Sequence, residues 1–385
     1  MDFLEDQERR ALRDAVSSIA KPYGGRYYSE HAAAREPCRE LWDELARGGY
    51  VGVNVPEQYG GGGGGLEELA VVCEETGAAG APLLLLLVSS AISVEVLARF
   101  GSEEQRSTWL PRLATGEKMV FAVTEPEAGS NTHQLTTSAT RDTGGDWILR
   151  GTKYYISGVD EADALLVVAR TGRDEQTGRG RLSLFIVPTD APGFERTPLP
   201  VDLMLPERQF TLFFDDVRLP ADALVGEEGQ GLAQVFQGLN PERITGAALC
   251  VGVGRRALTQ AADYAVGRSV WDGRPIGSHQ GVAHPLAQAK IEIELAALMT
   301  TKAAWAHDHG VPAGEASNMA KFAAAEAGLN ALTAAMQTHG GNGVASEYGL
   351  VPLWGLARLL RIAPVSREMV LNHVAQHSLG LPRSY

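Results

Sequence analysis

The chain has 385 residues, 44% of them hydrophobic and 21% charged, which is ordinary for a globular protein with a large core. Its formal net charge of −13 argues against nucleic acid or a membrane surface as the main partner, because both are bound through basic faces. Cys38, Cys73 and Cys250 lack the spacing of a disulfide framework or a zinc site, and the acidic start of the chain has no apolar segment of signal-peptide length. We therefore expect a cytoplasmic protein with reduced thiols.

Residues 1–118 carry a helical pattern, which predicts an N-terminal helical domain. Apolar positions recur at helical spacing in residues 8–16 and again in residues 41–45. Residues 60–65 are all glycine, but no Lys-Ser/Thr pair follows them, so we expect a surface loop rather than a phosphate-binding loop. The apolar run at residues 83–88 is far shorter than the roughly 20 residues of a membrane-spanning helix.

Residues 119–225 change character and predict a middle β domain. Short apolar or alternating runs occur at residues 120–123, 147–149, 164–169 and 182–187, with Gly, Pro and Asp between them. The spacers are too short for the helices that parallel βαβ units need. We therefore expect a compact antiparallel barrel or sandwich.

Residues 226–385 return to a helical pattern and predict a C-terminal helical domain. Ala- and Leu-rich segments predict helices at residues 257–267, 286–306, 316–337 and 365–377. Asn240 has the character of an N-cap and Pro241 that of a first helical residue, while residues 307–309 resemble a solvated helix end. Small residues such as Gly252 and Gly254 would let helices approach closely. The fold class is thus α+β, in the order helices, sheet, helices.

Two segments of the middle region carry candidate binding chemistry. Residues 121–131 read Phe-Ala-Val-Thr-Glu-Pro-Glu-Ala-Gly-Ser-Asn, and residues 151–158 read Gly-Thr-Lys-Tyr-Tyr-Ile-Ser-Gly. Each leaves an apolar strand and enters a turn with hydroxyls, glycine and backbone donors. This suits an isoalloxazine ring, which needs hydrogen bonds at one edge and flat apolar contact on its face. Taken singly, each segment is an ordinary strand-to-turn signal.

Together, the two segments resemble the signatures of the acyl-CoA dehydrogenase family. The first is Thr124-Glu125-Pro126-x-Ala128-Gly129-Ser130 and the second is Gly151-x-Lys153-x-Tyr155-Ile156-Ser157. Further matches follow the family's order over essentially the whole chain: Val55-Pro56-Glu57-x-Tyr59-Gly60-Gly61, Asp215-Asp216-Val217-x-Leu219-Pro220, Pro241-Glu242-Arg243, Gln280 and Gln337-x-x-Gly340-Gly341-x-Gly343. The resemblance implies that family's architecture, with an antiparallel middle β domain and a C-terminal four-helix bundle.

The resemblance also implies an activity and partners. It implies an FAD-dependent acyl-CoA dehydrogenase of fatty-acid β-oxidation, which introduces a double bond next to the thioester. Electrons would pass to an electron-transfer flavoprotein, and the assembly would be a homotetramer built from dimers or a mixed assembly with a related chain. A metal is not expected, because His373 and His377 lack the glutamate of a zincin motif.

The cofactor residues follow from the matched positions. Those implied to surround the flavin are Phe121, Val123, Thr124, Gly129, Ser130, Tyr155, Ile156 and Ser157. Members of the family usually have Trp where Tyr155 stands, and another flat aromatic still packs on the ring. Those implied to hold the pyrophosphate and adenosine, often across a dimer interface, are Arg268, Trp271, Gln280, Gln337, Gly340 and Gly341. A guanidinium pairs with phosphate in bidentate fashion, and glycines let backbone approach it closely.

The usual catalytic base of the family is absent. Counted without gaps from Gly343, its position falls at Pro364, which offers neither acid nor base. The isovaleryl-CoA and long-chain enzymes carry the base on an earlier helix, where Glu directly precedes Arg, and this implies Glu242. A carboxylate in the first turn of a helix is also explained by the helix dipole alone, which lowers its pKa, whereas burial raises it.

Residues beside Glu242 and in the first signature are candidates for substrate contacts. Asn240 and Arg243, with Ser130, are candidates for contacts with the CoA portion, and surface pairing is the other interpretation.

Pro364 and the absence of an Arg-Asp pair near Gly355 and Leu356 leave a non-catalytic or half-site subunit as an alternative. An acyl-CoA oxidase is a further alternative, although its chains are usually longer. The acyl chain length and branching are not indicated.

Overall fold

Six helices form the N-terminal region, as its periodicity predicts. The computed structural model describes residues 5–271 and 273–383, with only the backbone described at Leu232, Phe236, Gln237 and Gly238. The helices are α1 (Gln7–Ala20), α2 (Gly25–Ala34), α3 (Arg39–Arg47), α4 (Leu66–Ala79), α5 (Val94–Phe100) and α6 (Glu103–Ala114). The apolar run at residues 83–88 leads into a buried π-helical segment, Leu86–Ser93. Among the described residues, no helix is long and apolar enough to cross a membrane.

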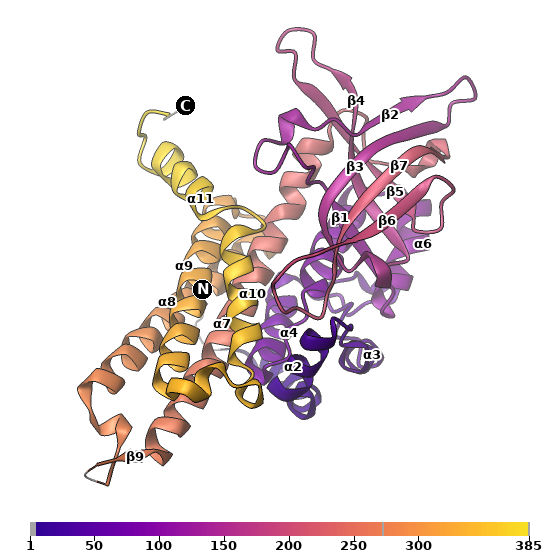
Figure 1. Cartoon of the computed structure of the whole chain (residues 1–385). Coiled ribbons are helices and arrows are strands. Elements are labelled where there is room, and N and C mark those ends of the chain that lie inside the picture. The colour runs from indigo at the N-terminus through magenta and orange to yellow at the C-terminus, as the bar shows by residue number, and fades with distance from the viewer. Residues whose placement is uncertain (1–4, 272, 384–385) are drawn as a thin grey trace.

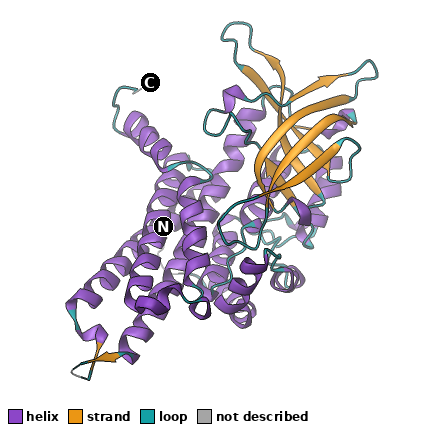
Figure 2. Cartoon of the chain, in the orientation of Figure 1, coloured by secondary structure: helices purple, strands orange, loops and turns teal. Residues whose placement is uncertain are grey.

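The middle region folds into one eight-stranded sheet (Figures 1 and 2). Its strands are β1 (Met119–Ala122), β2 (Ser138–Arg141), β3 (Trp147–Ser157), β4 (Ala164–Arg173), β5 (Gly180–Pro188), β6 (Phe194–Leu199), β7 (Gln209–Leu219) and β8 (Leu224–Val225). The order is β6-β7-β3-β2-β4-β5-β8, and β1 pairs with β4. The antiparallel expectation holds for most pairs, but β1 and β2 each run parallel to β4. The connection from β1 to β4 passes through β2 and β3 rather than through a helix. Parallel pairing therefore does not require a helix between consecutive strands here, contrary to the expectation from the short spacers.

The C-terminal region is a helical bundle built around α7 (Gly231–Gly267). The other helices are α8 (Gln280–Asp308), α9 (Gly314–His339), α10 (Leu350–Ile362) and α11 (Arg367–His373), and a short β9–β10 hairpin (Ser269–Val270 and Arg274–Pro275) joins α7 to α8. Pro241 lies inside α7. The prediction that Asn240 caps a helix beginning at Pro241 is therefore wrong: packing of α7 continues the helix for ten residues before this proline. The pattern also missed α10, which is buried along one side.

Close approach between α4, α7 and α8 depends on glycine, as predicted. A Cβ at Gly252 would lie 2.1 Å from the carbonyl oxygen of Glu74 in α4, and one at Gly254 would lie 2.2 Å from Cδ1 of Ile293 in α8. Since the obstacle at Gly252 is backbone, any side chain there would force the helices apart.

The end of α8 caps the beginning of α4. Gly65, the N-cap of α4, has no side chain to accept the first amides, and Asp308 takes its place by accepting from Leu66 N at 2.9 Å and Glu67 N at 2.8 Å. The neighbouring His307 is buried and contacts Glu95 Oε1 at 3.0 Å. The expectation of a solvated end at residues 307–309 is therefore correct for Asp308 and His309, which are exposed, and wrong for His307, which is buried.

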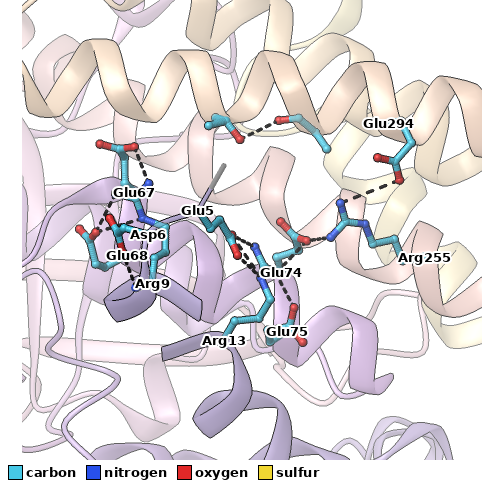
Figure 3. Close-up of polar contacts among 12 residues, drawn as sticks. Glu5, Asp6, Arg9, Arg13, Glu67, Glu68, Glu74, Glu75, Arg255 and Glu294 are labelled. Carbon is cyan, nitrogen blue, oxygen red and sulfur yellow. Dashed lines mark hydrogen bonds and ion pairs between the residues drawn. The ribbon is translucent and has the colours of Figure 1, made fainter. Parts of the chain in front are cut away.

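A network of ion pairs ties the first helix to the bundle (Figure 3). Arg13 of α1 pairs with Glu5, Glu74 and Glu75. Arg255 of α7 also pairs with Glu74 and lies 4.0 Å from Glu294 of α8. These side chains are partly buried, so their charges are screened less than those of isolated surface pairs. The network fixes the N-terminal helices on the same helix that carries Glu242.

Glu207 is a buried carboxyl that, among the described residues, has no charged partner at hydrogen-bond distance. It lies in the loop between β6 and β7, is 5% exposed, and accepts the amide of Leu84 at 2.9 Å through one oxygen. Burial raises the pKa of Glu207 to about 7. The folded chain thus holds a proton there that the unfolded chain releases at lower pH.

We predict that Glu207→Gln stabilises the protein above neutral pH. The folded pKa lies above the ordinary value, so the wild type loses stability as pH rises from about 4.5 to about 7, and glutamine has no such loss. The gain at pH 8 relative to pH 4.5 should reach up to about 3 kcal/mol. Thermal unfolding midpoints of both proteins across this range test it, and an equal difference at both pH values would contradict it.

Candidate active site

A buried ion pair joins the two segments of the sequence that were assigned to the flavin. Lys153 of β3 is fully buried, and its Nζ lies 2.9 Å from Glu125 Oε1 and donates to the carbonyl oxygen of Val123 at 2.9 Å. The amide of Tyr154 also donates to the carbonyl oxygen of Thr124 at 2.8 Å. Residues 121–131 and residues 151–158 are therefore held side by side, although about thirty positions separate them.

The carboxylate of Glu125 is saturated with donors. Besides Lys153, it accepts the amide and hydroxyl of Thr136, both at 2.7 Å, and the amide of Thr137 at 3.0 Å. Burial alone would raise its pKa, but the Lys153 charge and these hydrogen bonds lower the pKa of Glu125 to about 2. Burial lowers the pKa of Lys153 to about 8, against the effect of Glu125, so both groups are charged at neutral pH.

Tyr155 projects from an irregularity in β3. The pairing of β3 with β7 shifts between Lys153 and Ile156, and Tyr155 has a φ of 57°, in the left-handed region that aromatic residues avoid. Such a conformation costs on the order of 1–3 kcal/mol. The bulge leaves the Tyr155 side chain 55% exposed while Ile156 is buried. A flat aromatic held off the sheet in this way suits stacking against a planar ring.

The other residues assigned to the flavin lie around this bulge. Phe121 is buried in β1, and Val123 and Thr124 are partly buried just beyond that strand. Gly129 and Ser130 are exposed in the following turn, and a Cβ at Gly129 would meet no protein atom within 4 Å. Ser157 exchanges hydrogen bonds with the side-chain amide of Gln209 at 2.9 and 3.1 Å. The donors and the open turn fit the edge of an isoalloxazine ring.

The residues assigned to the pyrophosphate and adenosine gather at the opposite end of the molecule, near the β9–β10 hairpin (Figure 1). Arg268 ends α7, Gln280 begins α8, and Gln337 lies in the last turn of α9, just before Gly340 and Gly341. Arg268, Gln280, Gln337 and both glycines are exposed, and Trp271 is completely exposed. A guanidinium, amides and open glycine backbone fit a phosphate-bearing ligand.

Glu242 lies on α7 between these two groups of residues. It is in the interior of the helix, so the helix dipole does not explain it, contrary to the alternative that the sequence left open. The residue as a whole is partly exposed, but its carboxyl is desolvated by the surrounding protein. This desolvation raises the pKa of Glu242 to about 7, against the lowering effect of Arg243 and Lys321. A carboxyl whose pKa is near neutral suits general base catalysis.

Asn240 and Arg243 contact each other beside Glu242. Arg243 donates from Nη1 to Asn240 Oδ1 at 3.0 Å and is 8% exposed, and its Nε has no hydrogen-bond partner among the described residues. Pro364 follows α10, at the turn between α10 and α11. Lys321 of α9 donates to the carbonyl oxygens on either side of this turn, Arg361 at 3.2 Å and Val365 at 2.5 Å.

Sequence reasoning missed the roles of Glu125, Lys153 and Lys321. A signal for Lys153 was available, because it shares the inward parity of Trp147 and Leu149 in its strand, where a charge needs a partner. Lys321 had no such signal, since an interior lysine in an Ala-rich helix is identified only by the loop that packs on it.

Comparison with known proteins places all three regions in one family. The chain matches the models of the acyl-CoA dehydrogenase N-terminal domain at residues 6–117, middle domain at residues 120–217 and C-terminal domain at residues 229–379. It is 57% identical to acyl-CoA dehydrogenase FadE12 of Mycobacterium tuberculosis over 100% of this chain and 99% of that protein.

Solved structures agree with these matches. Butyryl-CoA dehydrogenase from Megasphaera elsdenii has a TM-score of 0.92 and 28% identity, covering 98% of this chain and 100% of that one. A glutaryl-CoA dehydrogenase from Mycobacterium smegmatis in complex with FADH2 has a TM-score of 0.90 and 27% identity, and the match covers 99% of this chain and 96% of that one.

We predict that Lys153→Met releases the two signature segments from each other. The variant leaves the Glu125 carboxylate buried without its charged partner, which costs about 3–5 kcal/mol, and FAD retention should fall with it. Thermal unfolding and the flavin-to-protein absorbance ratio measure both effects. Arg150→Met is the matched control, because its pair with Asp216 is 57% exposed on each side and should contribute less than about 1 kcal/mol. Equal behaviour of the two variants would contradict the prediction.

Proposed function

The chain belongs to the acyl-CoA dehydrogenase family, and from this premise we propose that it dehydrogenates an acyl-CoA thioester with Glu242 as the base. Members of the family are FAD-dependent oxidoreductases that act on CH–CH groups. The observation that carries the proposal is the Glu242 carboxyl, which lies within α7 and has a pKa of about 7. The position of the family's usual base is Pro364, which cannot accept a proton.

The chemistry requires one proton acceptor and one hydride acceptor. Near neutral pH a substantial fraction of Glu242 is ionised, so a carboxylate oxygen can take the proton as the Cα–H bond breaks. When bound, FAD supplies the acceptor for the hydride that leaves Cβ. The electrons left at Cα and the departure of the hydride together form the Cα–Cβ double bond. In this proposal an electron-transfer flavoprotein reoxidises the cofactor.

The geometry of α7 supports a cofactor site shared between two copies of the chain. Glu242 and Arg268 are separated by 26 positions along the helix, roughly 39 Å at about 1.5 Å per residue. This separation supports an arrangement in which the flavin-facing residues and the phosphate-facing residues of one chain hold different FAD molecules. A dimer in which each chain supplies one end resolves this, and a dimer of dimers would give the homotetramer that the resemblance implies.

The thioester oxygen has one hydrogen-bond donor fewer in this chain than the resemblance implies. Removal of the α-proton is favoured by hydrogen bonds to the thioester oxygen, where charge develops. The resemblance implies one donor from the ribityl chain and one from the backbone at the usual base, but Pro364 has no amide hydrogen. Arg243, with its unpartnered Nε, and Asn240 are proposed to order the entrance for the CoA thioester, and Ser130 to contact the CoA portion from the sheet side.

An anaerobic titration of the FAD-loaded protein with short, branched, long and ring-bearing acyl-CoA thioesters tests this function. We expect one class to bleach the visible flavin absorption of the wild type. In Glu242→Gln, which keeps the shape but cannot accept the proton, the reduction rate should fall by at least about 10²-fold.

Glu315→Gln, a carboxylate on α9 that accepts from Ser378, is the matched control and should be reduced like the wild type. Equal bleaching of wild type and Glu242→Gln would remove Glu242 from the mechanism. Absence of bleaching with every thioester would instead favour a non-catalytic or half-site subunit, the alternative suggested by Pro364.

A further inference from the structure

A cavity of about 290 Å³ lies where α7, the end of α9 and the turn before α10 meet. His339, the last residue of α9, and Tyr348, just before α10, form one side of it. The side from α7 consists of Arg256, Thr259, Gln260, Asp263 and Tyr264. These five positions have the spacing of a single helical face, so α7 turns a polar stripe toward the cavity. The residues proposed to hold the FAD phosphates are not among those that line it.

Three buried polar atoms of this lining have no hydrogen-bond partner among the described residues. They are Nε of Arg256, Oε1 of Gln260 and Nε2 of His339. Buried polar atoms in native proteins are paired in the great majority of cases, so each exception needs an explanation. The convergence of three such atoms on one small cavity indicates a common partner.

Two of the three atoms are hydrogen-bond acceptors. His339 is 3% exposed, and its Nδ1 donates to the carbonyl oxygen of Ala335 at 2.7 Å, so a neutral ring has its hydrogen there and a lone pair at Nε2. Gln260 donates from Nε2 to the carbonyl oxygen of Tyr348 at 2.9 Å, which leaves Oε1 as an acceptor. Asp263, one helical turn further along α7, adds an exposed carboxylate. A partner must therefore supply several N–H or O–H donors.

Arg256 presents a positive charge to the same cavity. Its guanidinium passes two glycines of the N-terminal region: a Cβ at Gly80 would lie 3.4 Å from Nε, and one at Gly25 would lie 3.9 Å from Nη2. These are ordinary packing contacts and they do not neutralise the charge. Among the described residues, no carboxylate forms an ion pair with Arg256. A guanidinium in this state favours an anionic partner, and its planar fork matches a carboxylate.

Aromatic rings form the middle of the cavity wall. The ring centroids of Tyr264 and His339 are 4.3 Å apart, and those of His339 and Tyr348 are 5.0 Å apart. Asn342 donates from Nδ2 to the hydroxyl oxygens of Tyr264 and Tyr348, at 3.2 and 3.3 Å, so both hydroxyl hydrogens can be donated elsewhere. Tyrosine faces also attract an ammonium group. The wall therefore offers apolar surface with polar groups at its edges.

We propose that this cavity binds a small zwitterion of the amino-acid class. The carboxylate of the ligand meets Arg256, and its primary ammonium lies among Gln260 Oε1, His339 Nε2 and the Asp263 carboxylate. An ammonium has three N–H donors, which matches these three acceptors. A simple anion would leave the acceptors unpaired, and a simple cation would leave Arg256 without a counter-ion. The inference is independent of the proposed function, which uses none of these residues.

Calorimetric titration of the FAD-loaded protein tests the ligand class. The probes are γ-aminobutyrate and L-alanine, compared with butyrate and butylamine, each of which keeps only one of the two charges. We expect one saturable site per chain for an amino acid, and at least about tenfold weaker binding of both single-charge analogues, because each loses a charged hydrogen bond. Tighter binding of γ-aminobutyrate than of L-alanine would assign the site to amino acids with widely separated charges, and the reverse would assign it to α-amino acids.

Two substitutions test the position of the ligand. Arg256→Gln removes the contact to the carboxylate and His339→Phe removes the Nε2 acceptor, so each should weaken binding at least about tenfold. Arg358→Gln is the matched control for the first, since Arg358 is a partly exposed arginine of α10 outside the lining. His309→Phe is the control for the second, because His309 Nδ1 bonds the carbonyl oxygen of Trp305 at 2.9 Å at the exposed end of α8. If Arg256→Gln does not fold, His339→Phe decides the question.

Four results would contradict the proposal. Absence of saturable binding of both amino acids would mean that water alone fills the cavity. Butyrate or butylamine binding as tightly as the amino acids would overturn the zwitterion. Binding that is unchanged in Arg256→Gln and His339→Phe would place the ligand elsewhere. Binding that occurs only in FAD-free protein would assign the cavity to the cofactor.

Discussion

The length of α7 is the constraint on which the rest of the molecule depends. It runs unbroken from Gly231 to Gly267, about 55 Å at about 1.5 Å per residue, and touches the N-terminal helices, the sheet and the other bundle helices. Glycines at 252 and 254 admit its neighbours, and Arg255 joins the ion-pair network of α1 and α4. Because Glu242 lies within α7 and Arg268 caps its C-terminal end, the proposed catalytic carboxyl and the residue proposed to bind phosphate are fixed far apart. This separation is the basis of the proposal that a second copy of the chain completes the site.

The sheet carries the residues that are proposed to face the flavin. The Lys153–Glu125 pair locks two strand-to-turn segments together, and the bulge at Tyr155 turns an aromatic ring away from the sheet. On the bundle side, Lys321 donates to the carbonyl oxygens of Arg361 and Val365, on either side of Pro364. In both places a buried lysine, whose desolvation is unfavourable, holds a loop. The strain and the charge are concentrated where the proposed reaction takes place.

The periodicity of the sequence predicts most of the fold, and each wrong or missed prediction has a physical cause. The order of helices, sheet and helices is confirmed, as is the family, because local patterns agree with the tertiary structure over most elements. Pro241 was misread because a proline usually opens a helix, whereas here packing carries α7 through it. The capping of α4 by Asp308 was missed because its partners, the amides of α4, lie over 240 positions away. The separation of Tyr155 from Arg268 was suggested only by the resemblance, since motif spacing carries no direction in space.

A complementation experiment tests the account most directly, because it requires both Glu242 and the shared site. One chain carries Glu242→Gln, and a second, differently tagged chain carries Arg268→Ala with Gln337→Ala. Each variant alone should reduce flavin poorly with the preferred acyl-CoA, since every site lacks either its base or its hold on the phosphates. Mixed dimers purified through both tags should regain activity, because one site in each combines the intact Glu242 of the second chain with the intact Arg268 and Gln337 of the first. Mixed dimers as inactive as the separate variants would contradict the account.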